Sequence, residues 1–399
     1  MKQTLQPLSG IRVLDFGHTV MGPCCGMILA DLGAEVIKVE PTGKGDPTRY
    51  LKGFGSGYFG YFSRNKKSVS IDLKSQGGQE IARKLVQSAD VLIENFAPGT
   101  MDRLGLSKDQ ALGVNPKLIY TSLKGFMPGP YQERLALDEV VQMMGGLAYM
   151  TGPTGQPLRA GTSAVDIAGG MFGVIGILAA LRDRDETGKG TVVETALYES
   201  LVFLMGQHLC YAAQSDTLIP PMPERVSAWA VYQIFECSDG RPLFVGITTD
   251  NHWVRFCQTI GWTDFLENDA LKSNGQRIDN KTIVLERFAT FFASLNQAEA
   301  MMVLEKARVP FAPVQRPEDL FDDPHLAATK GLLRTQLPDG TPTDLPRLPL
   351  QIGGAISDSV TDAPPVGADT HAVLKSIGLS SEQIDAALQQ NIIQAGGLA

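Results

Sequence analysis

Residues 11–39, IRVLDFGHTVMGPCCGMILADLGAEVIKV, decide the fold of this chain. The apolar run Ile11–Phe16 predicts a strand, and Cys24–Leu32, which ends before the capping glycine Gly33, predicts a helix. A second strand is expected over Glu35–Val39. A strand, a helix and a strand in this order form a βαβ unit, in which the two strands run parallel. We therefore expect a parallel sheet.

The same alternation continues to residue 123. Strands are predicted at Ser68–Leu73, Asp90–Glu94 and Leu118–Leu123, and a helix is predicted over Gly77–Ser88. The first half of the chain is therefore expected to be an α/β structure with an open sheet of Rossmann type.

A second, smaller domain is expected after a break in the helical periodicity that runs over Thr191–Ala213. Residues 214–227, which include three prolines, are interpreted as a linker. Residues 228–324 open with two short strand patterns, Ala230–Glu236 and Pro242–Ile247, that resemble a hairpin and are followed by helical patterns. This segment is predicted to be a small α+β domain.

The composition is that of an ordinary globular protein. A length of 399 residues suggests two domains. The net charge of −8, with no basic run longer than Lys66-Lys67, argues against nucleic acid or a membrane surface as a partner. The apolar run Ile167–Leu181 is shorter than the roughly 20 residues that span a bilayer, so a buried helix is expected there. The N-terminus lacks a secretory apolar core and the five cysteines form no C-x-x-C pair, so we expect a cytoplasmic protein with free thiols.

Several common kinds of site are absent from the sequence. The glycines after the first predicted strand, at 17, 22 and 26, lack the G-x-G-x-x-G spacing of a dinucleotide site, and no P-loop is present. The five histidines form no H-x-x-x-H or Cys/His cluster, so no metal site is predicted. A G-x-S-x-G elbow, which would indicate a serine hydrolase, is also missing.

Asp166 is the single acid in the stretch AGTSAVDIAGGMFG, residues 160–173. Ser163–Asp166 fits a capping box, in which the carboxylate would lie in the first turn of a helix and satisfy backbone N–H groups. The alternative is that Asp166 is a nucleophile or a base, because an apolar setting leaves a carboxylate poorly solvated and reactive. The two interpretations are compatible.

The loops after the predicted strands offer cations, an amide and aromatic rings. His18 follows the first strand, Lys74 the third and Asn95-Phe96 the fourth, and Lys124 follows the next. Side chains of these kinds at the ends of the strands suit a ligand with phosphates and a flat base, because an open α/β sheet binds its ligands there. The alternative for each lysine is a solvated surface charge.

Six stretches together resemble the class III CoA-transferase family, which includes formyl-CoA transferase, carnitine CoA-transferase and α-methylacyl-CoA racemase. The stretches are LSGIRVLDFGHTVMGP, LGAEVIKVEP, NKKSVSIDLK, ADVLIENFAPGTMDRLGL, NPKLIYTSLKGFMPGP and GTSAVDIAGGMFGVIGILAAL. The resemblance implies a Rossmann-like large domain built from residues 1–213 and 325–399. It also implies an interlocked, ring-like homodimer.

The resemblance further implies a reaction and a site. Asp166 matches the family's nucleophile, which forms an anhydride with the donor acyl group and then an aspartyl-CoA thioester that passes CoA to the acceptor acid. CoA and acyl-CoA are substrates in this reaction, and no permanently bound cofactor is expected. The positions that match CoA-binding residues of the family are His18, Thr19, Ile71, Asp72, Leu73, Lys74, Asn95, Phe96, Ala97, Arg103, Lys124, Gly125, Phe126 and Met127.

Departures from the family pattern narrow the hypothesis. Val20 stands where formyl-CoA transferase has a glutamine, Leu137 stands where the racemase has its histidine, and Glu224–Trp229 lacks the glycines of a mobile lid. The leading hypothesis is CoA transfer from succinyl-CoA to a short carboxylic or dicarboxylic acid, with Arg134 and Arg159 as candidates to bind a second carboxylate. The alternatives are an acyl-CoA racemase or epimerase and a non-catalytic acyl-CoA-binding protein.

Overall fold

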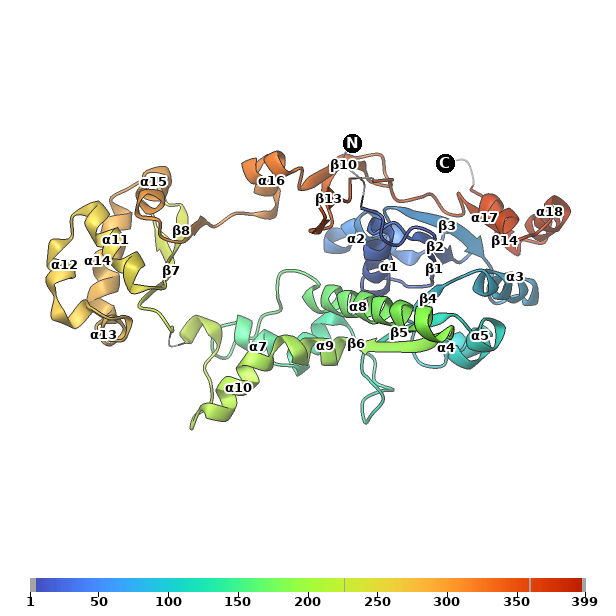
Figure 1. Ribbon diagram of the computed structural model, residues 1–399, viewed down its shortest axis with the longest axis horizontal. Coiled ribbons are helices and arrows are strands. Elements are labelled where there is room, and N and C mark those ends of the chain that lie inside the picture. The colour runs from blue at the N-terminus through green and yellow to red at the C-terminus, as the bar shows by residue number, and fades with distance from the viewer. Residues whose placement is uncertain (1–4, 226, 359, 397–399) are drawn as a thin grey trace. The chain divides into compact units, whose positions relative to one another are not determined.

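A seven-stranded sheet forms the centre of the larger of the two units into which the chain divides (Figure 1). The computed structural model describes residues 5–225, 227–358 and 360–396. The large unit comprises Met1–Glu224 and His325–Ala399, and the small unit comprises Arg225–Pro324.

The order of the strands in the large sheet is that of a Rossmann-type fold. The strands are β1 (Arg12–Asp15), β2 (Glu35–Glu40), β3 (Lys66–Ile71), β4 (Val91–Glu94), β5 (Ile119–Lys124), β6 (Thr191–Ala196) and β14 (Ile393–Gln394). Their order is β14-β3-β2-β1-β4-β5-β6, and every neighbouring pair is parallel except β14 with β3. The chain winds outward in opposite directions from β1 and β4, so the crevice at their carboxyl ends is where a ligand is expected. The predicted fold class is confirmed.

The helical prediction over Thr191–Ala213 is wrong in its first six residues. Thr191–Ala196 form β6, which pairs in parallel with Ile119–Lys124 of β5. The β-branched residues of TVVETA favour a strand once a neighbouring strand supplies hydrogen-bonding partners. The helices α9 (Leu197–Leu204) and α10 (Gly206–Gln214) begin only after this strand.

Two apolar cores cover the two faces of the large sheet. Val13 and Leu14, adjacent in β1, are both fully buried but belong to different cores. One core includes α1 (Met21–Asp31) and α8 (Ala164–Thr187), and the other includes α3 (Gln76–Gln87).

The remaining helices of this unit are α2 (Tyr58–Phe62), α4 (Thr100–Arg103), α5 (Lys108–Val114), α6 (Asp138–Met144), α7 (Leu147–Thr151), α16 (Pro324–Thr329, which begins one residue before the unit boundary), α17 (Thr370–Ser376) and α18 (Ser381–Gln389), with 3-10 turns at Pro47–Tyr50, Gly53–Gly57 and Met222–Glu224. Short hairpins pair β10 (Leu332–Gln336) with β11 (Pro342–Pro346) and β12 (Gln351–Ile352) with β13 (Ala355–Ile356).

Helix α8 packs closely on α1 through glycines. A Cβ atom on Gly170 would lie 2.9 Å from the carbonyl oxygen of Met21, so no larger residue fits there. The buried helix predicted over Ile167–Leu181 is buried on this side only, because Met171 and Ile175 on α8 are 51% and 59% exposed. Within the described residues, α8 is also the one helix long and apolar enough by length and composition to cross a membrane.

The small unit is a three-stranded antiparallel sheet with helices. The sheet has the order β7 (Val231–Glu236), β8 (Pro242–Ile247), β9 (Phe311–Pro313), and the predicted hairpin of its first two strands is confirmed. Its helices are α11 (Asp250–Ile260), α12 (Thr263–Glu267), α13 (Asn274–Asp279), α14 (Lys281–Ala293) and α15 (Gln297–Ala307), with 3-10 turns at Asp269–Leu271 and Pro317–Asp322. Stacked aromatic side chains, including Trp253, Phe256 and Phe288, fill a core of its own.

Candidate active site

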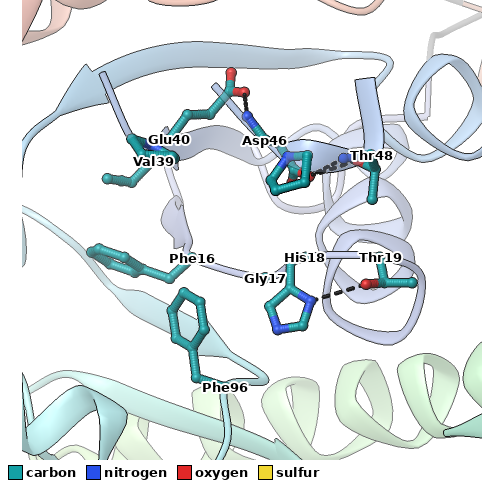
Figure 2. A pocket seen from close by; sticks show the side chains of 11 residues that line it. Phe16, Gly17, His18, Thr19, Val39, Glu40, Asp46, Thr48 and Phe96 are labelled. Atoms are coloured by element: carbon teal, nitrogen blue, oxygen red, sulfur yellow. Dashed lines mark hydrogen bonds between the residues drawn. The ribbon is translucent and has the colours of Figure 1, made fainter. Parts of the chain in front are cut away.

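Two cavities of the large unit meet at the carboxyl ends of β1 and β4. The first, here called the His18 cavity, has a volume of about 390 Å³ (Figure 2). The second, the Asp166 cavity, has a volume of about 280 Å³. His18, Thr19 and Phe96 line both, so the loop between β1 and α1 is their shared wall.

Two buried side chains and the half-buried Asn95 hold this loop at successive peptide groups. The N–H of Gly17 donates to Asp15 Oδ1 at 2.8 Å, and Lys38 Nζ donates to the Gly17 carbonyl at 2.9 Å. The N–H of His18 donates to Asn95 Oδ1 at 2.8 Å, and Asn95 Nδ2 donates back to the His18 carbonyl at 2.9 Å. The loop is therefore fixed by contacts with three other parts of the sheet.

A layer of buried charges supports the His18 cavity. Lys38 Nζ lies 2.6 Å from Asp46 Oδ2, and both groups are almost fully buried. Burial lowers the pKa of Lys38, but the nearby carboxylates of Asp46 and Asp15 outweigh burial, so its pKa is raised and the ammonium stays charged. The N–H of Asp46 donates to Glu40 Oε2 at 2.8 Å, which fixes the wall opposite His18 and Thr19 (Figure 2).

His18 presents a neutral imidazole to the cavities. Burial lowers its pKa, so the ring is uncharged at pH 7. Its Nδ1 lies 2.9 Å from Thr19 Oγ1, and its ring centroid is 5.3 Å from that of Phe96 (Figure 2). These two rings form an aromatic surface beside which a flat group fits.

The capping box predicted at Ser163–Asp166 is wrong. Helix α8 begins at Ala164 and carries Asp166 in its first turn, but the Ser163 side chain makes no capping hydrogen bond. Instead, the N–H groups of Val165 and Asp166 donate to Asp138 Oδ2 at 2.8 and 3.1 Å. A charged carboxylate is a stronger acceptor than a hydroxyl, which explains why Asp138 takes this place.

Asp138 is itself held in a polar network. Gln142 Nε2 donates to Asp138 Oδ1 at 2.5 Å, and the other end of the Gln142 amide accepts the N–H of Ala160 at 2.8 Å. Arg159 Nη2 lies 3.6 Å from Asp138 Oδ1. The side chain that holds the start of α8 is thus fixed by two neighbours.

The electrostatic setting makes Asp166 unusual. Burial, and to a smaller extent the charge of Asp138, raise its pKa to about 7, with Arg159 opposing both. Near pH 7 the carboxylate therefore exchanges between protonated and ionised forms. When it is ionised, a poorly solvated carboxylate of raised basicity is a good nucleophile.

The structure brings about half of the predicted site residues together. His18, Thr19, Asn95, Phe96, Ala97, Lys124 and Gly125 line the Asp166 cavity with Asp166 itself. Lys124 does so with its ammonium engaged, because Nζ donates to Glu94 Oε2 at 2.7 Å and to the Phe96 carbonyl at 2.8 Å.

The other predicted residues lie elsewhere. Ile71 is fully buried in the core, and Phe126 and Met127 line a separate neighbouring cavity. Asp72, Leu73, Lys74 and Arg103 line neither the His18 cavity nor the Asp166 cavity.

Sequence reasoning did not predict two segments as walls of the site. One is the segment from Gln132 to Asp138, of which the sequence singled out only Arg134 and Leu137, and which lines the Asp166 cavity. The other is the loop after β2, with Pro41, Asp46, Pro47 and Thr48 against the His18 cavity. The acidic start of α6 at Asp138 was a usable signal, because acids concentrate in the first turn of helices.

A Rossmann-type sheet with a cavity at its switch point, lined here by Asp166, is the arrangement in which α/β enzymes bind their ligands. The chain belongs to CoA-transferase family III, whose family model matches residues 8–370. It is therefore a CoA-transferase.

Relatives of known activity cover most of the chain. The acetyl-CoA:oxalate CoA-transferase of Acetobacter aceti is 34% identical and covers 82% of this chain and 86% of its own length. The succinyl-CoA–L-malate CoA-transferase beta subunit of Chloroflexus aurantiacus is 30% identical, with coverage of 98% and 99%. Among solved structures, a CAIB/BAIF family protein from Brucella suis has a TM-score of 0.81 and 30% identity, and covers 94% of this chain and 100% of its own.

Proposed function

We propose that this enzyme transfers CoA from succinyl-CoA to a short carboxylic or dicarboxylic acid, with Asp166 as the nucleophile. One observation carries the proposal: Asp166 lines a cavity at the switch point of the sheet and has a pKa raised to about 7. Its place in the resemblance to the family agrees with this role.

The reaction needs no proton transfer. Asp166 Oδ attacks the thioester carbonyl carbon, the C–S bond breaks, and CoA leaves as a thiolate while the acyl group forms an anhydride with Asp166. The thiolate then attacks the Asp166 carbonyl carbon, which releases the donor acid as a carboxylate and leaves an aspartyl-CoA thioester. The acceptor carboxylate attacks this thioester to form a second anhydride, and the returning thiolate takes the acceptor acyl group and restores the Asp166 carboxylate.

The helix start contributes less to charge stabilisation than its position suggests. A helix N-terminus offers free N–H groups to a developing oxyanion, but Asp138 already accepts those of Val165 and Asp166. The contribution of α8 is therefore to hold Asp166 in place. Exclusion of water from the anhydride and the thioester rests on the cavity walls.

The two joined cavities suit an extended ligand such as acyl-CoA. Its thioester belongs beside Asp166, and the aromatic pair His18 and Phe96 lies further along, where a flat group fits. The residues that line the part of this path beside Asp166 are His18, Thr19, Asn95, Phe96, Ala97, Lys124 and Gly125. Contacts of CoA with Ile71–Lys74, Arg103, Phe126 and Met127 stay predictions from the resemblance.

Arg134 is our candidate for the second carboxylate of a dicarboxylic acid. It lines the Asp166 cavity, stacks over the Tyr131 ring at 4.9 Å, and forms no ion pair in the part of the chain that the structure describes. Arg159, in contrast, already faces Asp138 and Glu139 at 3.6 and 3.8 Å. The names of the relatives, which act on oxalate and L-malate, support a dicarboxylate.

We also propose that the enzyme is an interlocked homodimer in the cytoplasm. The exposed apolar side chains of α8, α9 and α10 support an interface, since large exposed apolar patches mark association sites. These are Met171, Ile175, Leu178, Phe203, Leu204 and Leu209. The free cysteines, four of them buried, suit a reducing compartment.

A CoA-exchange assay tests the proposal. The wild-type enzyme is incubated with succinyl-CoA and a panel of mono- and dicarboxylic acids, and the new acyl-CoA is measured by liquid chromatography. We expect one or more acids to accept CoA, and Asp166→Asn to abolish the exchange without loss of the folded state. Arg134→Met is expected to raise KM about tenfold or more for dicarboxylates only, whereas the exposed control Arg182→Met changes nothing.

Three outcomes would contradict the proposal. Normal exchange by Asp166→Asn would remove Asp166 from the reaction. If no acid accepts CoA and the α-carbon of a 2-methylacyl-CoA takes up deuterium instead, the enzyme is a racemase. Tight CoA binding without either reaction would indicate a binding protein.

A further inference from the structure

Thr19 has a backbone conformation that its side chain disfavours. Its φ is +65°, in the left-handed region. The other described non-glycine residues with positive φ are asparagine, arginine or lysine, and Thr19 alone among them is β-branched. For such a residue this conformation is a genuine outlier. Strain of this kind persists only where the surroundings enforce it, and it concentrates at functional sites.

The strained residue stands at the wall between the two cavities. Thr19 and its neighbour His18 line both the His18 cavity and the Asp166 cavity. The side chains of these two residues also contact each other, with His18 Nδ1 at 2.9 Å from Thr19 Oγ1 (Figure 2). A change at Thr19 therefore alters the path between the cavities.

Asn95 at the end of β4 supplies the constraint next to Thr19. Its amide both accepts from the His18 N–H at 2.8 Å and donates to the His18 carbonyl at 2.9 Å. The amide also packs closely against the start of α1: a Cβ atom on Gly22 would lie only 3.0 Å from Asn95 Oδ1. With the peptide groups before Thr19 held by Asn95 and the helix beginning at Met21, the chain turns sharply at Thr19.

We propose that Asn95 is a positioning residue, which uses its amide to hold the His18–Thr19 backbone in its strained form and so shapes the passage that acyl-CoA occupies. This inference rests on the proposed function for the identity of the ligand. It differs from a direct contact between Asn95 and CoA, since both ends of the Asn95 amide are already engaged with His18.

Paired double variants distinguish the two roles of Asn95. Glycine adopts the left-handed conformation freely, whereas alanine is disfavoured there by a factor of about 5 to 30. Both substitutions at Thr19 remove the hydroxyl, so they differ by one methyl group and by the backbone preference that this methyl imposes. If Asn95 acts by holding the strain, glycine at position 19 compensates for its loss and alanine does not.

The measurement is the Kd of CoA by calorimetry. We expect Asn95→Ala to weaken CoA binding about tenfold or more, and Asn95→Ala/Thr19→Gly to bind at least fivefold more tightly than Asn95→Ala/Thr19→Ala. Equal affinities of the two double variants would overturn the proposal in favour of a direct contact. An unchanged Kd in Asn95→Ala would overturn it as well.

A second readout keeps the proposal testable without CoA. With Asn95 intact, Thr19→Gly is expected to unfold at a higher urea concentration than Thr19→Ala, because only alanine retains the strain. The reverse order would show that position 19 is not strained. If the wild-type enzyme neither binds nor transfers CoA, the proposed function fails, while this comparison still decides whether Thr19 is held under strain.

Discussion

Asp138→Asn should shift the pH dependence of CoA transfer toward acid. Asp138 Oδ2 lies 3.1 Å from the amide nitrogen of Asp166 and is part of the reason that the pKa of Asp166 is about 7. Two unit charges about 6 Å apart repel by about 3 kcal/mol at an effective dielectric constant of about 20, which corresponds to about two pH units. The burial of Asp166 remains in the variant, so we expect the acid limb of kcat/KM to move down by about 1 to 2 pH units.

The sign follows from the state that Asp166 needs for attack. The proposed mechanism requires the ionised carboxylate, so wild-type activity is expected to rise with pH through about 7. Without the charge of Asp138, Asp166 ionises at lower pH and the rise comes earlier. The assay is kcat/KM for CoA exchange between pH 5 and 9.

A matched control tests whether the shift is specific to the charge of Asp138. Glu139→Gln removes the adjacent charge, which is 58% exposed and lies 3.8 Å from Arg159 Nη1, and should leave the midpoint within about 0.3 pH units because solvent screens it. An unchanged midpoint in Asp138→Asn, or an upward shift, would refute the electrostatic argument.

Two further predictions concern stability. Gly170→Ala should lower the free energy of unfolding by about 1 to 3 kcal/mol and reduce kcat, because its Cβ meets the Met21 backbone. The control Gly113→Ala on α5 should be neutral or slightly stabilising, because its Cβ would meet no neighbouring atom within 4 Å. Urea titration of both variants decides this, and equal losses would contradict the close packing of α1 and α8. Asp166→Asn should stabilise the fold at pH 8 by about 2 to 4 kcal/mol, because folding raises the pKa of this carboxyl from 3.8 to about 7 and makes its ionised form unfavourable. The difference in unfolding free energy between Asp166→Asn and the wild type should vanish below about pH 4. A variant less stable than the wild type at pH 8 would rule out the raised pKa of Asp166.

The central strands and α1 were predictable because each carries a local pattern. The apolar run Ile11–Phe16 and its βαβ context placed β1, and the strand ends then placed His18, Asn95 and Lys124 at one edge of the sheet. Strand β6 was not predictable in this way, because TVVETA adjoins a helical segment and becomes a strand by pairing with β5.

The electrostatics of the site depend on contacts that no local pattern contains. Asp138 reaches Asp166 across 28 residues, and Asn95 reaches His18 across 77. A capping box was the reasonable local prediction for Ser163–Asp166, but tertiary packing supplied a stronger acceptor. The candidate nucleophile could therefore be named from sequence, whereas the groups that set its pKa could not.

Trapping of the covalent intermediate on Asp166 tests the central claim most directly. The enzyme is incubated with succinyl-CoA, quenched with hydroxylamine and digested, and the peptide that contains Asp166 is examined by mass spectrometry. The account predicts a hydroxamate on Asp166 that forms only with the acyl-CoA, decreases when an acceptor acid is added, and is absent in Asp166→Asn. A transfer-competent enzyme that shows no modification of Asp166, or that is modified at another carboxylate, would contradict it.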